Sequence, residues 1–194
     1  MSEYIPREYW PARLAREGRK YVGRSGMDDN ASERQAGQFL AHLLPHIPDD
    51  CEDLLDYGCG PGRMAVRLAA ACDRYTGVDI CQQALVHNCR LIYLEEDSLP
   101  FSAGQFDCVV AVTVIQHIVA PDQFKLWMDE LNRVADAGCI FLIIDNHKEG
   151  DGTAHVLART PEVVAEALGC EIVRSEVISV EKKDSHFFMV GRKI

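Results

Sequence analysis

A glycine-rich turn is the first group of residues whose spacing indicates chemistry. Asp56 precedes Gly58, Gly60 and Gly62, between an apolar run and a helical pattern. Glycines at a strand-to-helix turn let the backbone approach a ligand, and the N–H groups that start the helix remain available to bind it. Arg63 stands where the dinucleotide fingerprint has its third glycine, and the chain has no triphosphate-binding G-x-x-x-x-G-K-[ST] motif. The acid beside the turn favours a ligand with positive charge over a pyrophosphate.

Two further acids follow predicted strands. Asp79 ends the second strand, and Asp97 lies with Ser98 after the third. An acid at the first position can accept both ribose hydroxyls of an adenosine, and one at the second can accept from an adenine amino group. Taken alone, each acid is as typical of a helix cap or a solvated loop as of a ligand-binding site. Together with the turn, they predict a site for an adenosine that carries positive charge and no phosphate.

The elements that position these residues alternate along the chain. A short apolar run followed by residues at helical spacing is typical of β-α units and a parallel sheet. We expect strands at 54–58, 75–80, 91–97, 106–114 and 138–145, and helices at 32–44, 63–72, 81–90, 122–135 and 161–168.

Several residues predict where helices begin and end. Ser32 and Gln35 have the spacing of a capping box for the helix at 32–44. Thr160 can cap the last helix, Pro161 suits its first position, and Gly169 suits its left-handed end.

The C-terminal part predicts a different kind of pairing. Segments 171–180 and 185–194 read as strands with no helix between them, so we expect an antiparallel pair. The predicted fold is α/β: a Rossmann-like, open, mostly parallel seven-stranded sheet with helices on both faces and a terminal antiparallel β-hairpin. We expect residues 1–30 to form an N-terminal arm or lid, and residues 31–194 to form a single domain.

Composition excludes several classes of protein. The chain has 194 residues and is 47% hydrophobic, which argues against disorder. Its net charge of −10 argues against nucleic acid as a partner. Its start lacks a signal pattern, and its apolar runs are far shorter than the ~18 residues of a membrane span. The eight cysteines contain no CxxC pair, so we expect free thiols in a cytoplasmic protein and no metal site.

The chain resembles the class I S-adenosylmethionine-dependent methyltransferases over about residues 30–194. The resemblance rests on LLDYGCGPG, TGVDI, LEEDSLPFSAGQFDCVVAVTVIQHI and ELNRVADAGCIFLII. It implies S-adenosylmethionine as the cofactor. It also implies that the turn cradles the methionine part, that the acid after strand two holds the ribose, that the acid after strand three meets adenine, and that residues after strand four border the methyl group. The implied cofactor-binding residues are Asp56, Gly58, Cys59, Gly60, Gly62, Arg63, Asp79, Ile80, Asp97, Ser98, Thr113 and Val114.

The acceptor is expected to be a nitrogen or oxygen atom of a small molecule. The segment after strand four has neither the [DNS]-P-P-[YF] loop nor the Pro-Cys pair of nucleobase enzymes. His117 either is a core histidine or accepts a substrate proton at an ordinary pKa of about 6.5. Asp145 and Asn146, just past strand five, either contact the substrate or cap a turn. All three are candidate catalytic residues.

The arm offers further candidates. Its arginines 13, 19 and 24 either bind the cofactor carboxylate or form a solvated helix face. Its aromatic residues 9, 10 and 21 either roof the site or only pack. Residues 148–155 read as a mobile loop that could serve as a lid.

Two alternatives stay open. The chain is similar, more weakly, to protein α-N-terminal amine methyltransferases, through residues 9–10, 26–27, the VIQHI segment and 145–146. That likeness implies a peptide acceptor handled by His117 and Asn146, although the loop after Asn146 lacks a clear counterpart of the family's catalytic Asp. The other alternative is a non-catalytic, cofactor-binding partner subunit. Nothing in the sequence fixes the oligomeric state.

Overall fold

The computed structural model describes residues 4–17, 29–82, 90–94, 97–147, 155–180 and 183–194. Seven strands of this part of the chain form one sheet, in the order β3-β2-β1-β4-β5-β7-β6. The first five strands along the chain are parallel, and β7 lies antiparallel between β5 and β6. The predicted sheet and its terminal hairpin are therefore confirmed. The strands are β1 (Asp53–Tyr57), β2 (Arg74–Asp79), β3 (Arg90–Tyr93), β4 (Phe106–Val112), β5 (Ala135–Asn146), β6 (Cys170–Val180) and β7 (Lys183–Lys193).

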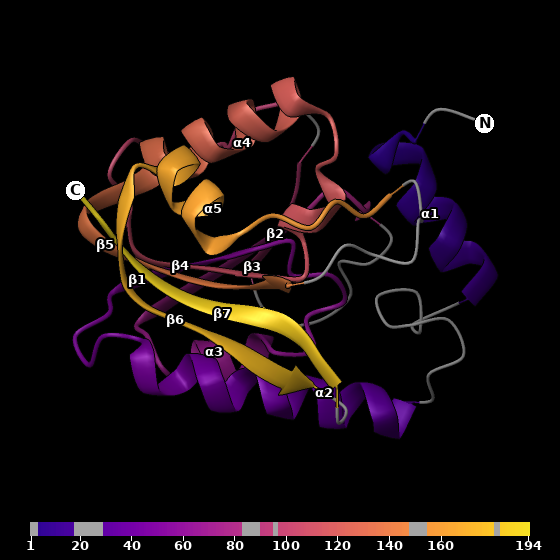
Figure 1. The fold of residues 1–194 in the computed structure, drawn as a ribbon, viewed down its shortest axis with the longest axis horizontal. Helices are drawn as coiled ribbons and strands as arrows, with labels where there is room; N and C mark the ends of the chain where they lie inside the picture. Colours follow the sequence, from indigo (N-terminus) through magenta and orange to yellow (C-terminus); the bar gives the residue numbers. More distant parts are fainter. Residues whose placement is uncertain (1–3, 18–28, 83–89, 95–96, 148–154, 181–182) are drawn as a thin grey trace.

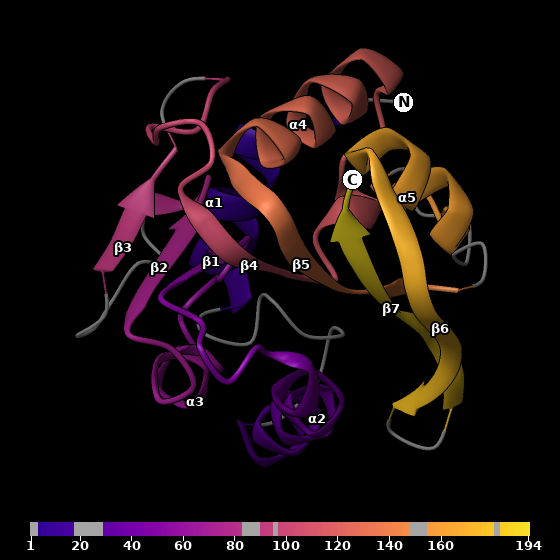
Figure 2. The same ribbon diagram turned by 90° about the vertical axis from the view of Figure 1, so that its left-hand side faces the viewer.

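Helices cover both faces of the sheet. In Figure 1, α4 and α5 lie above the strands and α2 and α3 lie below them, and Figure 2 shows the same three layers from the side. A further helix, α1, lies at the end of the sheet where the parallel strands finish (Figure 1). The helices are α1 (Pro6–Glu17), α2 (Asp29–Leu43), α3 (Ala65–Ala69), α4 (Pro121–Val134) and α5 (Pro161–Leu168), with short 3-10 turns η2 (Leu44–His46) and η4 (Ile115–His117).

The central strands are apolar throughout because both of their faces are buried. Successive side chains point to opposite faces of a strand. Val109 and Phe141 belong to the core beneath α4, whereas Val110 and Leu142 belong to the core above α2 and α3. All four are fully buried, so the near-continuous apolar run of β5 reflects a strand packed on both sides.

Helix ends follow the prediction at one helix and depart from it at another. The Thr160 hydroxyl accepts a hydrogen bond from the Val163 N–H at 3.4 Å, and Gly169 ends α5 with a φ of 62°. The predicted capping box is wrong, because α2 already includes Asp29 and Ser32 is buried inside the helix.

Other boundaries are shifted. The helix predicted at 63–72 is shortened to α3, and β3 ends at Tyr93 rather than at residue 97. Most of the helix predicted at 81–90 lies outside the described residues. The arm contains α1, which the sequence did not predict because this segment has no clear amphipathic period and none of its residues becomes buried. That residues 1–30 form an arm or lid, and residues 31–194 a single domain, remains a prediction. No helix in the described part of the chain is long and apolar enough to cross a membrane.

Candidate active site

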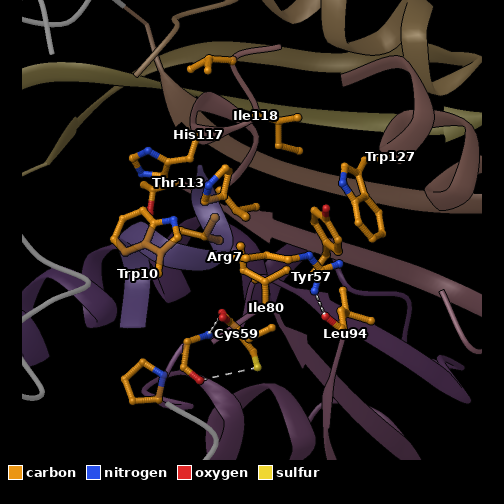
Figure 3. Close-up of a pocket in the computed structure, with 18 of the residues that line it drawn as sticks. Arg7, Trp10, Tyr57, Cys59, Ile80, Leu94, Thr113, His117, Ile118 and Trp127 are labelled. Atoms are coloured by element: carbon orange, nitrogen blue, oxygen red, sulfur yellow. Dashed lines mark hydrogen bonds between the residues drawn. The ribbon is translucent and has the colours of Figure 1, made fainter. Parts of the chain in front are cut away.

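A cavity of about 460 Å³ opens at the end of the sheet where β1, β2 and β4 finish, beside α1. Its walls come from α1, α2, the turn after β1, the end of β2 and the segment that follows β4. Figure 3 shows side chains from α1 and from the strand ends pointing into the same space. The predicted site residues that line it are Gly58, Cys59, Gly60, Arg63, Asp79, Ile80, Asp97, Thr113, Val114 and His117.

The glycine turn depends on conformations that favour glycine. Gly58 and Gly60 have φ angles of 75° and 53°. A Cβ atom on Gly58 would lie 2.4 Å from Cγ2 of Val114, closer than side chains approach one another. The Gly58 N–H donates to the Val78 carbonyl at 2.9 Å, which holds the turn against β2. Val114 therefore packs directly against the turn, and position 58 has no room for a side chain.

Asp79 connects this turn to the end of β2. Its carboxylate accepts hydrogen bonds from the Gly60 N–H at 2.9 Å and the Cys81 N–H at 2.7 Å. Burial raises the pKa of this carboxyl, and the two N–H donors oppose that rise. Asp79 thus lines the cavity and also fixes the shape of the turn.

Asp56 and Gly62, both predicted to bind the cofactor, do not line the cavity. Side chains alternate along β1, so Asp56 points to the face that α2 and α3 cover, and Tyr57 points to the α4 face. The Tyr75 hydroxyl donates to Asp56 at 2.8 Å, and burial raises the pKa of the Asp56 carboxyl to about 7. Gly62 closes the turn by donating its N–H to the Cys59 carbonyl at 3.1 Å. Gly62 therefore shapes the turn from outside the cavity, and Asp56 ties β1 to β2 through Tyr75.

The third predicted acid contacts α1. The Arg7 guanidinium donates to an Asp97 carboxylate oxygen at 3.4 Å and to the Leu94 carbonyl. Ser98 is exposed and does not line the cavity. Arg7 therefore joins the first helix to the end of β3, a contact that the sequence did not predict.

Backbone strain marks the segment after β4. Thr113 has a φ of 54° and is the one non-glycine residue with positive φ in the described part of the chain. Such a conformation of a β-branched residue costs about 1–3 kcal/mol and is retained where the surroundings fix it. Its N–H donates to the Ile144 carbonyl at 2.7 Å, so β5 holds the strained residue in the cavity wall.

Both ring nitrogens of His117 have hydrogen-bond partners. Nδ1 lies 2.7 Å from the His155 carbonyl oxygen, and Nε2 lies 3.2 Å from the Gln116 amide nitrogen. The ring stands edge-on to Trp10, with the ring centres 4.8 Å apart (Figure 3). Burial lowers the pKa of His117 to about 4. The histidine lines the cavity as predicted, but as a neutral side chain.

Asp145 and Asn146 lie outside the cavity, in contrast to their predicted place at the substrate. The Asp145 carboxylate accepts the N–H groups of Gln116 at 2.8 Å and Asn146 at 2.9 Å. Burial raises the pKa of the Asp145 carboxyl to about 7. The pair holds η4 against β5, so it acts on His117 through the backbone.

The arm supplies part of the roof. Trp10 lines the cavity, whereas Tyr9 packs behind it, stacked on His155 at 4.8 Å. Arg13 bonds to Glu17 at 3.0 Å and lies over the Trp10 ring, so it does not line the cavity as a carboxylate-binding residue would. The other predicted arm residues (19, 21, 24 and 26–27) and most of the predicted lid loop (148–154) lie outside the described residues.

Several cavity residues escaped prediction. Tyr57 lies on β1 with its ring centre 5.8 Å from that of Trp127 in α4. Strand alternation beside Asp56 predicts the face to which Tyr57 points, but not that the cavity reaches it. Trp127 belongs to the apolar stripe of α4, and nothing in that stripe separates a core residue from a cavity residue. Arg7 gives no sequence signal at all.

Comparisons with known proteins agree with this geometry. Residues 55–143 match a family model described as a methyltransferase domain. The part of the chain from β1 to β5 is thus similar to a methyltransferase domain. An uncharacterized methyltransferase of Synechocystis is 30% identical over 103 residues, which are 50% of this chain and 48% of that protein. The chain thus spans about half the length of this curated relative.

Solved structures with the same fold cover nearly all of the chain. A Burkholderia thailandensis 1,6-didemethyltoxoflavin-N1-methyltransferase, solved with 1,6-didemethyltoxoflavin and S-adenosylhomocysteine, has a TM-score of 0.71 at 21% identity and covers 100% of this chain and 92% of that one. A Pyrococcus horikoshii protein has a TM-score of 0.72 at 16% identity and covers 96% and 99%. The predicted fold is therefore confirmed, and the match over residues 55–143 agrees with the predicted methyltransferase family.

We expect Gly58→Ala to destabilise the protein. The new methyl group would meet Val114 at 2.4 Å and would force alanine into a left-handed conformation. Overpacking and strain together should lower the free energy of unfolding by about 2–4 kcal/mol in urea titrations. Gly37→Ala is the matched control: it lies in α2 with open space around its Cβ, and should stabilise the protein by about 0.5–1 kcal/mol. An unchanged free energy of unfolding in Gly58→Ala would contradict the described turn.

Asp145 predicts a pH dependence of stability. Its carboxyl has a pKa of about 7 in the folded protein and about 3.9 when unfolded. The folded state therefore binds more protons, so this contribution to stability is complete below about pH 4 and is lost as the pH rises to about 7. We expect wild-type protein to lose more stability than Asp145→Asn between about pH 5 and pH 8 in urea titrations. Asp49→Asn, at an exposed turn, should follow the wild type. Equal pH dependence in Asp145→Asn and wild type would contradict a raised pKa.

Proposed function

We propose that this protein transfers a methyl group from S-adenosylmethionine to a nitrogen or oxygen atom of a small-molecule acceptor. The observation that carries the proposal is a single cavity that joins the glycine turn and Asp79 to His117 and Trp10. Cofactor-binding and acceptor-binding residues would thus border one space, as direct transfer between two bound molecules requires.

The residues present fit the cofactor. The glycine turn borders the cavity, and Gly58, Cys59, Gly60 and Arg63 would hold the methionine part. Asp79 would accept the ribose hydroxyls and Ile80 would pack on adenine. Asp97 would accept the adenine amino group, with Ser98 beside it, and Thr113 and Val114 would border the methyl group. Gly62 would act indirectly, by closing the turn, and Asp56 by tying β1 to β2 through Tyr75.

The chemistry needs little from the protein beyond alignment and exclusion of water. The bound cofactor supplies a methyl group on a positively charged sulfur. The acceptor's lone pair would form the new bond to the methyl carbon, and the electrons of the broken carbon–sulfur bond would remain on sulfur. Thr113, Val114 and Trp10 would hold the acceptor in line and exclude water.

The walls of the cavity support a small acceptor. Ile118, Val119 and Ala120 continue the apolar lining beyond His117, and α1 closes over this side through Trp10. Cavities of about 300–1,000 Å³ with apolar walls and a few polar groups are typical of small-molecule sites. The Burkholderia relative, which covers the whole chain, was solved with a small heterocycle. A peptide acceptor has less support, because Asn146 lies outside the cavity and its N–H donates to Gln116.

Cofactor binding should raise the melting temperature. S-adenosylmethionine or S-adenosylhomocysteine at about 100 times its Kd should add ~2.7 kcal/mol, which corresponds to a rise of roughly 5–11 °C for a chain of this size. NAD should give no rise, because the turn lacks the dinucleotide spacing. Asp79→Asn should lose most of the rise, and the exposed control Asp49→Asn should keep it. The same rise in Asp79→Asn, or none in wild type, would overturn the proposed cofactor site.

Transfer itself can be followed with methyl-labelled S-adenosylmethionine. We expect label to appear in a small-molecule extract incubated with wild-type protein, and to be lost with Asp79→Asn. Peptides with free or blocked α-amines, incubated in parallel, test the peptide alternative: label on the free set alone would replace the small-molecule proposal. Tight S-adenosylhomocysteine binding without label in any fraction would instead favour a non-catalytic partner subunit.

A further inference from the structure

Gln116 is a buried residue whose side-chain amide forms hydrogen bonds to two neighbouring residues. Its Oε1 lies 3.2 Å from the backbone nitrogen of Asn146, and its Nε2 lies 3.2 Å from Nε2 of His117. A backbone N–H can only donate, so the amide oxygen has to face Asn146. The amide NH₂ group then has to face His117.

This orientation fixes the proton on the histidine ring. An amide N–H can only donate, so His117 Nε2 has to accept and carries no proton. The proton of the neutral ring is then on Nδ1, which lies 2.7 Å from the His155 carbonyl oxygen. A carbonyl oxygen only accepts, so the bond to His155 also requires the proton to be on Nδ1. The bonds to Gln116 and to His155 therefore give the same assignment.

The backbone around Gln116 holds the amide in place. The Gln116 N–H donates to Asp145 at 2.8 Å, and its carbonyl accepts from the Leu157 N–H at 2.8 Å. Arg159 donates to the Ile115 carbonyl at 3.2 Å and the Ile118 carbonyl at 2.6 Å, on either side of the turn. Turning the amide would therefore place its NH₂ group against the Asn146 N–H, two donors facing each other, and leave that N–H bonded to Asp145 alone.

We propose that Gln116 is a positioning residue that keeps His117 neutral, with its proton on Nδ1, so that His117 borders the acceptor without taking a proton from it. The role of His117 beside the acceptor rests on the proposed function. The position of the proton on its ring rests on the hydrogen bonds alone. It differs from the sequence-based hypothesis of a histidine base.

The charged surroundings favour the same state. Two basic groups face the ring, Arg13 from α1 and His155 from the segment before α5, and each disfavours a positive charge on His117. Burial acts in the same direction and contributes most to a pKa of about 4. Burial and charge therefore oppose the imidazolium form and outweigh the Nδ1 bond to the His155 carbonyl, which favours it.

The state of His117 restricts the acceptor. Of the described residues that line the cavity, the carboxylates are Asp79, bonded to the glycine turn, and Asp97, bonded to Arg7. A hydroxyl acceptor would need a base for its proton, and His117 has its one lone pair engaged. The geometry therefore points to an acceptor that brings its own lone pair, such as a neutral ring nitrogen or a free-base amine. Any N–H proton would leave to water after the new carbon–nitrogen bond has formed.

NMR of the imidazole nitrogens in the full chain tests the inference directly. We expect His117 of the ligand-free protein to carry its proton on Nδ1 and to show no titration between about pH 5.5 and pH 8. The same tautomer should persist with S-adenosylhomocysteine bound. A ring protonated on Nε2, or one that takes up a second proton within this pH range, would overturn the proposal.

Two substitutions separate positioning from mere packing. Gln116→Glu keeps the acceptor for Asn146 but places a carboxylate at Nε2, so His117 should gain a second proton at roughly pH 5–7. Gln116→Leu removes the donor and should allow both tautomers. Gln105→Glu, at the opposite end of β4, is the control and should leave the His117 signals unchanged. Unchanged His117 signals in both Gln116 variants would also overturn the proposal.

The experiment distinguishes failure of this inference from failure of the proposed function. If S-adenosylhomocysteine does not bind wild-type protein, the proposed function fails, while the tautomer of His117 can still be measured. If it binds and His117 proves to be a titrating base, the cofactor site stands and the positioning role of Gln116 does not.

Discussion

The carboxylate of Asp79 holds together the two strand ends on which the cavity depends. One oxygen accepts the Gly60 N–H and the other the Cys81 N–H. β1 and β2 are already paired in parallel, but their pairing ends where the cavity begins. The turn is thereby held to β2 by the Asp79 carboxylate as well as by the bond from the Gly58 N–H to the Val78 carbonyl. Asp79 thus sets both the shape of the turn and the negative charge beside it.

A second buried carboxylate does the same work on the other side of the cavity. Asp145 fastens η4 to the end of β5, as Asp79 fastens the glycine turn to the end of β2. The strained Thr113 lies between these two anchored segments, and its N–H is held by Ile144. Backbone groups that would otherwise be left unpaired at the strand ends are satisfied by carboxylates from neighbouring strands. The cavity wall is therefore rigid at the points where a transferred group would have to be aligned.

Much of the fold and half of the site follow from sequence because they depend on local pattern. The Gly58 turn, Asp79 and Ile80 lie where a strand ends, and strand ends are visible as the close of an apolar run. The sequence shows that Asp56 and Asp145 end or follow a strand, but not that their side chains lie outside the cavity. Arg7 and Gln116 depend on contacts between segments far apart in the chain, Arg7 with Asp97 and Gln116 with Asn146. No periodicity or motif records such contacts.

The first helix closes the cavity but belongs to neither layer of the fold. It has no fully buried residue, and a few side chains join it to the rest of the chain: Arg7 bonds to Leu94 and Asp97, Tyr9 stacks on His155, and Trp10 and Leu14 pack against Cys81. Local opening of a segment without buried residues costs less free energy than global unfolding. With the proposed function, exchange of bound molecules past this helix would therefore depend on these contacts more than on the stability of the sheet. The lifetime of a bound product and the durability of the fold would for that reason be separate properties, and selection could change one without the other.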